Sequence, residues 1–182
     1  MADSQCELCL EYLDDGQLNR HSGIDLCDRC LEGDVMSRVR PRGFHFDVET
    51  WKTTSTDSNN RKKTWYNVRV TGSLPDDPPV DAAFCSEGLL EKIAKLFRKE
   101  IQVGDPLFDD YVYVRTDTPE ATERLLESEG AQMAIMEFVT SDGLVSIDSG
   151  RVSARRSDVD KMPDTDSMYL NTALLLHFLS KL

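Results

Sequence analysis

The 182-residue chain lacks the motifs by which several enzyme classes are recognised. It has no phosphate-binding glycine loop, no HExxH and no GxSxG. Histidine is scarce, and His21, His45 and His177 form no recognisable nucleophile or metal pattern. These absences exclude the enzyme classes that those motifs define and favour a non-catalytic protein. An enzyme of unfamiliar type, with a pocket that contains Cys85, His45 and the carboxylates of Asp105 to Asp110, is the alternative hypothesis.

Long apolar runs are also missing. No stretch approaches the roughly 18 apolar residues that cross a bilayer. The first residues, Met-Ala-Asp-Ser-Gln-Cys, carry neither the basic nor the apolar region of a secretory signal. We therefore expect no membrane span and a cytoplasmic location. Hydrophobic residues make up 40% of the chain and charged residues 30%, which is enough apolar material for a core.

Positive charge is in short supply, because the formal net charge is -12. Residues 1–36 alone hold nine acids against Arg20 and Arg29. So acidic a surface repels phosphate and disfavours nucleic-acid binding. We interpret the small basic clusters as solvated faces. The alternative, a nucleic-acid or transcription-associated zinc protein, predicts that these clusters converge on one face: Arg38, Arg40 and Arg42; Arg61, Lys62 and Lys63; Arg151, Arg155 and Arg156.

Against these absences stand two CxxC pairs near the N-terminus. Cys6 and Cys9 form the first pair, and Cys27 and Cys30 form the second after a spacer of 17 residues. Each CxxC supplies two sulfurs from one tight turn, and two such turns complete a tetrahedron around Zn²⁺. Since four thiolates leave no open coordination position, the pattern predicts a structural zinc site rather than a catalytic one.

Disulfides or a redox CxxC are the alternative interpretation of these cysteines. A cytoplasmic chain disfavours stable disulfides, and neither pair lies in a βαβ context typical of thioredoxin-like sites. His21 lies inside the spacer and could replace one thiolate. Because four cysteines already fill the sphere, we expect His21 to be a surface residue or to support a ligand.

The segment between and after the cysteine pairs has its own pattern. Asp14-Asp15-Gly16 indicates a turn and hence a short hairpin in residues 10–26. Leu31, Val35 and Val39 recur at intervals of four and predict a helix that begins at the second pair. The order of knuckle, hairpin and CxxC-led helix resembles a treble-clef zinc finger. Pro41 and Gly43 end the helix, so we predict a zinc finger over residues 1–40 and a second domain over residues 44–182.

The second domain opens with alternating segments at residues 44–48 and 65–71, which predict two strands joined by a polar loop over residues 53–63. We expect the aromatic residues here to pack in a core rather than to stack on bases. Residues 72–79 are proline-rich and should be irregular. A helix is predicted from Ser86 through Phe97, and Cys85 before it is interpreted as a buried thiol.

A distinctive GDPxFD element spans residues 104–109 and is followed by an alternating strand, a helix that begins at Thr118 and Pro119, and a hairpin over residues 144–154. The Asp-Pro pair indicates a turn, with Phe108 as its anchor. A break or bend is expected at Gly130 of the helical segment. Asp105, Asp109 and Asp110 could alternatively form a divalent-cation or acid/base cluster. From about residue 89 to residue 155 the chain resembles a bacterial domain family of uncharacterised function, a resemblance that implies a fold and supplies no activity.

The C-terminal segment, residues 168–182, places apolar side chains around much of a helix. We expect it to pack on the sheet, with a homodimer or partner interface as the alternative. His177 on this face is interpreted as a buried histidine rather than a ligand. Together these patterns predict an α+β protein: a zinc finger followed by an antiparallel sheet with packed helices. Its predicted role is a non-catalytic, zinc-stabilised module that binds an unidentified protein partner.

Overall fold

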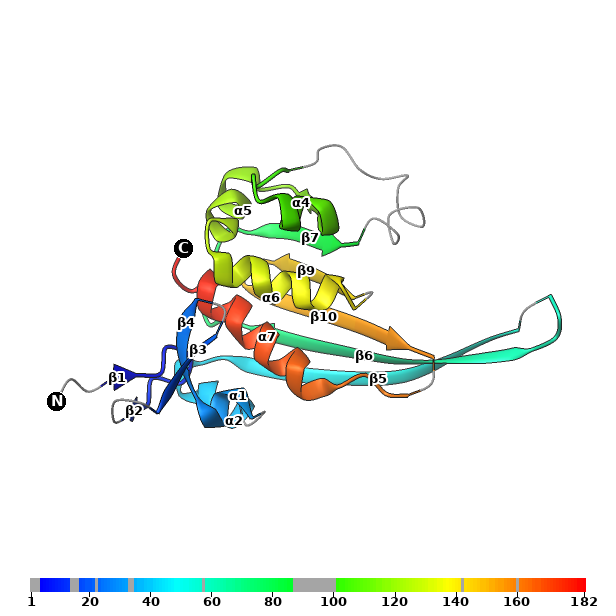
Figure 1. Ribbon diagram of the computed structural model, residues 1–182, viewed down its shortest axis with the longest axis horizontal. Coiled ribbons are helices and arrows are strands. Elements are labelled where there is room, and N and C mark those ends of the chain that lie inside the picture. The colour runs from blue at the N-terminus through cyan, green and yellow to red at the C-terminus, as the bar shows by residue number, and fades with distance from the viewer. Residues whose placement is uncertain are drawn as a thin grey trace.

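The structure, a computed structural model, describes residues 4–13, 17–21, 23–32, 35–56, 58–86, 101–141, 143–159 and 161–182. The chain is an α+β protein with antiparallel sheets, as predicted. Helices α6 and α7 lie across one face of the main sheet, the N-terminal elements gather at one end, and a long hairpin projects from the other (Figure 1). Within the described ranges no helix is long and apolar enough to cross a membrane.

The N-terminal segment is built from very short elements. Strand β1 (Ser4–Gln5) pairs with β2 (Tyr12–Leu13), and β3 (Leu18–His21) pairs with β4 (Ile24–Cys27), both antiparallel. The hairpin β3–β4 lies within the residues 10–26 predicted to form a hairpin, but it turns between His21 and Ile24 rather than at residues 14–16, which lie outside the described residues. Gly23, with φ of 79°, lies in the turn that joins β3 to β4.

The helix predicted after Cys27 is divided into two. Helix α1 (Asp28–Leu31) is capped at its C-terminus by Glu32. Helix α2 (Val35–Val39) is followed by the 3₁₀ helix η1 (Arg40–Arg42). Residues 33–34 lie outside the described residues. As predicted, the chain leaves this region at Gly43, which adopts the left-handed conformation with φ of 77°.

The main sheet has the strand order β5-β6-β10-β9-β7-β8, and each neighbouring pair is antiparallel. The strands are β5 (His45–Thr56), β6 (Lys62–Ser73), β7 (Asp81–Cys85), β8 (Tyr113–Thr116), β9 (Leu144–Asp148) and β10 (Arg151–Asp158). Alternate residues of the central strands are buried beneath the helices: Val68, Val70, Val145, Ile147, Val152 and Ala154. The closing hairpin β9–β10 confirms the prediction for residues 144–154.

Two features of the sheet differ from expectation. Residues 53–63 were predicted as a loop, but β5 continues to Thr56, where it pairs with Lys62 of β6. Threonine is β-branched and favours extended backbone even where both faces meet water, so a polar composition did not prevent strand formation. Strand β7 was not predicted, although its Phe84 is fully buried.

Of the aromatic residues expected to pack in a core, Phe44 is buried and Phe46 packs against the core, but the tryptophans of the first hairpin lie outside it. The guanidinium groups of Arg69 and Arg155 lie 5.4 Å and 5.0 Å from the ring centre of Trp51, and the ammonium of Lys63 lies 4.5 Å from that of Trp65. Strand alternation places both rings on the face of the sheet opposite the buried valines of β6. Their packing is therefore against cations at the surface.

The GDPxFD element forms a short helix, α4 (Pro106–Tyr111), rather than a turn that leads directly into a strand. The carboxylate of Asp105 caps it by accepting hydrogen bonds from the Leu107 and Phe108 amides at 2.8 Å and 3.1 Å. Phe108 is fully buried, which confirms it as the anchor. An Asp-Pro pair is as suitable for a helix N-terminus as for a turn, which explains the difference.

The next helices follow the predicted order with one shift. Helix α5 (Pro119–Leu126) begins where expected, after Thr118. The break before α6 (Glu129–Val139) falls at residues 127–128, not at Gly130, which is buried inside α6. The helix predicted from Ser86 falls on residues 87–100, which lie outside the described residues.

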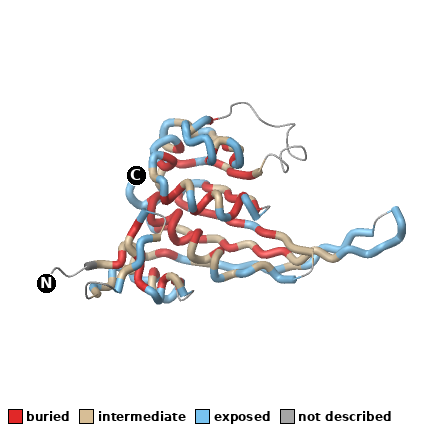
Figure 2. Tube along the Cα trace, viewed as in Figure 1, coloured by how far each residue is buried: buried red, intermediate tan, exposed pale blue. Residues whose placement is uncertain are grey.

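Helix α7 (Thr165–Leu179) occupies the centre of the fold. Every residue from Asn171 to Leu179 is buried, and α7 contacts β6, β10, α6 and α2 (Figure 2). The prediction that this helix packs on the sheet is confirmed. Its broad apolar surface is explained by contacts within the chain, so the homodimer through this helix is not needed to account for it.

The approach of α7 to β6 gives a first testable prediction. An added Cβ at Gly72 would stand 2.7 Å from Leu176 Cδ1 and 2.8 Å from Thr172 Cγ2. Because this contact is too short, Gly72→Ala should lower the free energy of unfolding by about 1–3 kcal/mol in urea titration. Ser73→Ala, on the other face of β6, is the control and should change it by less than about 0.5 kcal/mol. Equal stabilities would contradict the close packing.

Candidate metal centre

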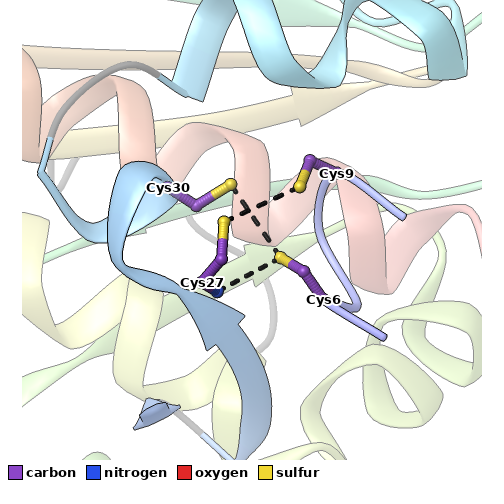
Figure 3. A group of neighbouring side chains, drawn as sticks. All are labelled: Cys6, Cys9, Cys27 and Cys30. Atoms are coloured by element: carbon purple, nitrogen blue, oxygen red, sulfur yellow. Dashed lines mark hydrogen bonds between the residues drawn. The ribbon is translucent and has the colours of Figure 1, made fainter. Parts of the chain in front are cut away.

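The four cysteines of the CxxC pairs converge on one point. Cys6 and Cys9 flank the turn between β1 and β2, Cys27 ends β4, and Cys30 lies in α1. All four sulfurs lie within 4.8 Å of one another and point toward a common centre (Figure 3). Three of the residues are buried and Cys9 is half-buried. The structure therefore brings together the complete ligand set that the sequence predicts.

The sulfur separations fit a single tetrahedral metal ion. Four sulfurs at the usual Zn–S distance of about 2.3 Å stand about 3.8 Å apart along the tetrahedron edges. The Cys6 and Cys30 sulfurs are 3.9 Å apart, and those of Cys9 and Cys27 are 3.8 Å apart. All four are free thiols, and these two contacts each join one CxxC to the other. The arrangement is that of a metal-ligand set rather than of two disulfides.

The backbone holds the first CxxC in its tight turn. The Cys27 amide donates a hydrogen bond to the Cys6 sulfur at 3.4 Å, as amides do to metal-bound thiolates. The Leu10 amide donates to the Cys6 carbonyl at 2.8 Å, and Leu10 adopts a left-handed φ of 64°. The Glu7 amide donates to the Asp25 carbonyl of β4 at 2.8 Å. These bonds fix both sulfurs of the turn toward the second pair.

Electrostatics show why this cluster needs a cation. The neighbouring Cys30 side chain and nearby backbone amides lower the pKa of Cys6 to about 4. Burial raises the pKa of Cys9 to about 11. Contact with the ionised Cys6, together with burial, raises the pKa of Cys30. Without a cation, ionisation of Cys6 therefore opposes ionisation of Cys30, whereas a bound metal ion stabilises thiolates.

Arg42 joins the first CxxC turn to α7. Its Nη1 donates to the Glu7 and Leu8 carbonyls at 3.2 Å and 3.3 Å and to His177 Nδ1 at 2.7 Å. Its Nη2 donates to Ser180 Oγ at 3.2 Å. The sequence analysis missed this role of Arg42, because no local pattern links residues so far apart in the chain. The polar His177 among the apolar residues of the last two turns of α7 was the available signal.

His177 is a neutral, buried histidine, as predicted, and does not belong to the cysteine group. Because Nδ1 accepts from Arg42, the ring proton is on Nε2, which lies 3.8 Å from Glu7 Oε2. Burial, with the charges of Lys181 and Arg42, lowers the pKa of His177 to about 4. The contact with Glu7 is therefore not an ion pair at neutral pH. Lys181 instead pairs with Glu7 at 3.2 Å.

The other candidate catalytic residues do not meet. Cys85 is buried on β7, and burial raises the pKa of its thiol. His45 is exposed on β5, at the edge of the sheet, and three strands separate β5 from β7. His21 is half-buried on β3 and is not a member of the cysteine group. A hollow of about 330 Å³ over β7, β8 and β9 is lined by Asp81, Arg115 and Asp148 among others, and by none of these three residues.

The aspartates of the GDPxFD element serve the backbone. Asp105 caps α4, and the Asp109 carboxylate accepts from the Val103 and Gly104 amides at 2.8 Å and 2.9 Å. Asp110 is exposed. Across the described ranges the four cysteines are the one group of His, Cys, Asp or Glu side chains whose geometry suits a metal ion. The cation-cluster alternative for these aspartates has no geometric support.

Several residues of the basic clusters are used inside the fold rather than as solvated faces. Arg38 pairs with Glu11. Arg156 is buried, donates to the Glu137 carbonyl and lies 3.6 Å from its carboxylate. With Arg42 in contact with His177, the clusters at residues 38–42 and 151–156 each contribute an arginine to internal contacts.

Comparison of the chain with protein-family models, with curated proteins and with solved structures found no match. The resemblance of residues 89–155 to a bacterial domain family gains no support from these comparisons. The geometry of the cysteine cluster therefore carries the functional argument.

The buried His177 gives a prediction for pH dependence. Its folded-state pKa of about 4 lies below the ordinary value of 6.5, so protonation favours the unfolded chain and stability falls as pH drops from 6.5 toward 4. Between pH 7 and pH 5.5 the free energy of unfolding of the parent should fall by about 1 kcal/mol more than that of His177→Gln. The amide oxygen of the glutamine can still accept a hydrogen bond from Arg42. Metal release at low pH affects both proteins and cancels in the difference. Parallel losses measured by urea unfolding would contradict a neutral, buried His177.

Proposed function

We propose that this chain is a non-catalytic protein-interaction module stabilised by one structural Zn²⁺. The observation that carries the proposal is the convergence of four cysteine sulfurs within 4.8 Å at tetrahedral separations. A four-thiolate set is typical of zinc in closed, structural sites. Free thiols are maintained in the reducing cytoplasm, which is where we place the protein.

The order of elements supports a treble-clef finger over residues 1–40 as a unit distinct from the α+β domain over residues 44–182. The first CxxC forms a knuckle, β3 and β4 form a hairpin, and the second CxxC connects the end of β4 to α1. Helix α1 has four residues and α2 has five, which is too short for stability without an anchor. Zinc supplies that anchor, and Arg42 attaches the finger to α7.

The acidic surface of the finger indicates the kind of partner. Residues 1–36 hold nine acids against two arginines, and four thiolates around Zn²⁺ add about two negative charges. Asp28 and Glu32 at α1 are exposed. A surface of this charge favours a protein partner with a basic patch and disfavours phosphate.

Metal content tests the central part of this proposal. Elemental analysis of purified protein should find one zinc per chain. Cys27→Ser removes one ligand and should lose the zinc and more than about 4 kcal/mol of unfolding free energy. Cys85→Ser changes the one cysteine outside the cluster and should retain the metal. A zinc-free parent, or a Cys27→Ser protein as stable as the parent, would sink the proposal.

The proposed interaction is tested by identifying the protein that binds to the folded finger. Affinity capture from native cells should recover one protein with the parent and with Cys85→Ser and lose it with Cys27→Ser, because the binding surface depends on the folded finger. Binding of the purified protein to DNA or RNA at low salt, abolished by raising the salt, would instead support the nucleic-acid alternative.

A further inference from the structure

The two edges of the main sheet are very different. Strand β8 has four residues, which is the usual way in which proteins keep an edge from pairing with another chain. Strand β5 has 12 residues, more than twice the usual strand length. It pairs residue for residue with β6 without a bulge, contains no proline, and has Asp47, Glu49 and Lys52 as its charged residues. Among the described edge strands of the main sheet, β5 is therefore the one that short length, a bulge or proline does not protect.

The outer half of this hairpin has little support from its own chain. Strand β10 pairs with β6 as far as Tyr66, opposite Asp158. Beyond that point, from Thr53 opposite Trp65 to Thr56 opposite Lys62, the sheet has only the strands β5 and β6. This ribbon, which we call the arm (residues 52–65), projects from the body of the molecule (Figure 1). A two-stranded ribbon is marginally stable alone and gains from a further strand.

The segments at the two ends of β5 have net charges of opposite sign. The arm holds four cations against Asp57, an excess of three positive charges: Lys52, Arg61, Lys62 and Lys63. Residues 1–49, the finger and the start of β5, hold eleven acids against five arginines, an excess of six negative charges. The finger and the arm lie at opposite ends of the molecule, so they do not meet within one copy (Figure 1).

We propose that the chain forms a homodimer in which the β5 strands of two copies pair antiparallel and each arm lies along the finger of the other copy. Strand β5 starts two residues after η1 of the finger and ends in the arm. Antiparallel pairing of its exposed stretch, residues 47–56, therefore carries each arm tip past the start of the other β5. At about 3.4 Å per residue, the described tip residues 58–61 then lie beside the start of the other β5, next to where the other finger ends.

The second copy is favoured over other occupants by this complementarity. A two-fold axis makes the contact isologous, so the basic arm meets the acidic finger twice and the assembly closes. Backbone pairing along β5 supplies affinity, and the opposite charges fix the antiparallel direction. A polyanion such as DNA would meet the arm favourably but would be repelled by the acidic body of a chain with net charge -12. This inference rests on the proposed function in one respect, because the folded finger is the counterpart of the arm.

Sedimentation equilibrium of the zinc-loaded full chain tests the dimer. The experiment uses low salt and about 0.1 mM protein, a concentration above the Kd of most specific interfaces. Under these conditions the measured mass should be twice the chain mass of 20.6 kDa. Lys62→Glu with Lys63→Glu should raise the dimer Kd by at least about tenfold, because like charges then face each other. The control, Arg115→Glu with Arg124→Glu, makes the same change in net charge at exposed positions of β8 and α5, at the edge of the sheet opposite β5, and should leave the Kd unchanged.

A second variant removes the arm without removing the sheet. Replacement of residues 54–64 by Asn-Gly joins Thr53 to Trp65 through a two-residue turn, at the point where these residues face each other. This protein should fold, retain zinc and sediment as a monomer. A parent that is monomeric at low salt, or a dimer that survives both arm variants, would overturn the proposal.

Two further outcomes separate the hypotheses. A monomeric parent whose arm binds DNA, with loss of binding in the Lys62→Glu, Lys63→Glu protein, would overturn the dimer in favour of nucleic acid. Zinc is measured on the same samples. A zinc-loaded monomer contradicts the dimer and leaves the structural zinc intact, whereas a zinc-free dimer supports the strand pairing and contradicts the proposed function.

Discussion

Four sulfur atoms within 4.8 Å of one another cannot all carry negative charge unless a cation lies among them. The N-terminal segment depends on this constraint, because its own elements are too small to hold it together. Strands β1 and β2 have two residues each, and α1 has four. Elements of this size bury little apolar surface, and small domains commonly replace the missing core by a structural metal.

The cluster is connected to the larger part of the fold through polar and apolar contacts together. The apolar core extends without interruption from Cys6, Leu8 and Leu26 of the finger to Leu174 and Leu175 of α7. At its margin the Arg42 guanidinium contacts two carbonyls of the first CxxC turn and the ring of His177. Because His177 is buried and Arg42 is half-buried, this bond helps to fix the position of the finger. The geometry of the cysteine turn and the burial of α7 therefore depend on each other.

Features with local chemical causes could be predicted from the sequence. The CxxC spacing predicted the ligand set because the tight turn alone brings two sulfurs together. The apolar positions of α7 predicted its packing, and Pro119 predicted the start of α5. The α+β class followed from the mixture of periodicities.

Other features depend on contacts between distant residues or on ambiguous local signals. Arg42 precedes the strands of the main sheet in the sequence and His177 follows them. No rule of sequence spacing therefore predicts the hydrogen bond between them. The arm was predicted as a loop because Thr53, Thr54 and Ser55 are polar, although extended backbone suits threonine equally well in water. Asp105 was assigned to a turn because a turn and a helix N-cap require the same side chain.

The central claim is that one metal ion coordinated by Cys6, Cys9, Cys27 and Cys30 organises the finger. X-ray absorption spectroscopy at the zinc edge of the purified protein tests it most directly. The account predicts a first coordination shell of four sulfur atoms at about 2.3 Å, with no nitrogen or oxygen ligand. A shell with three or fewer sulfurs completed by nitrogen or oxygen, such as a histidine or a water, would contradict a closed four-cysteine site.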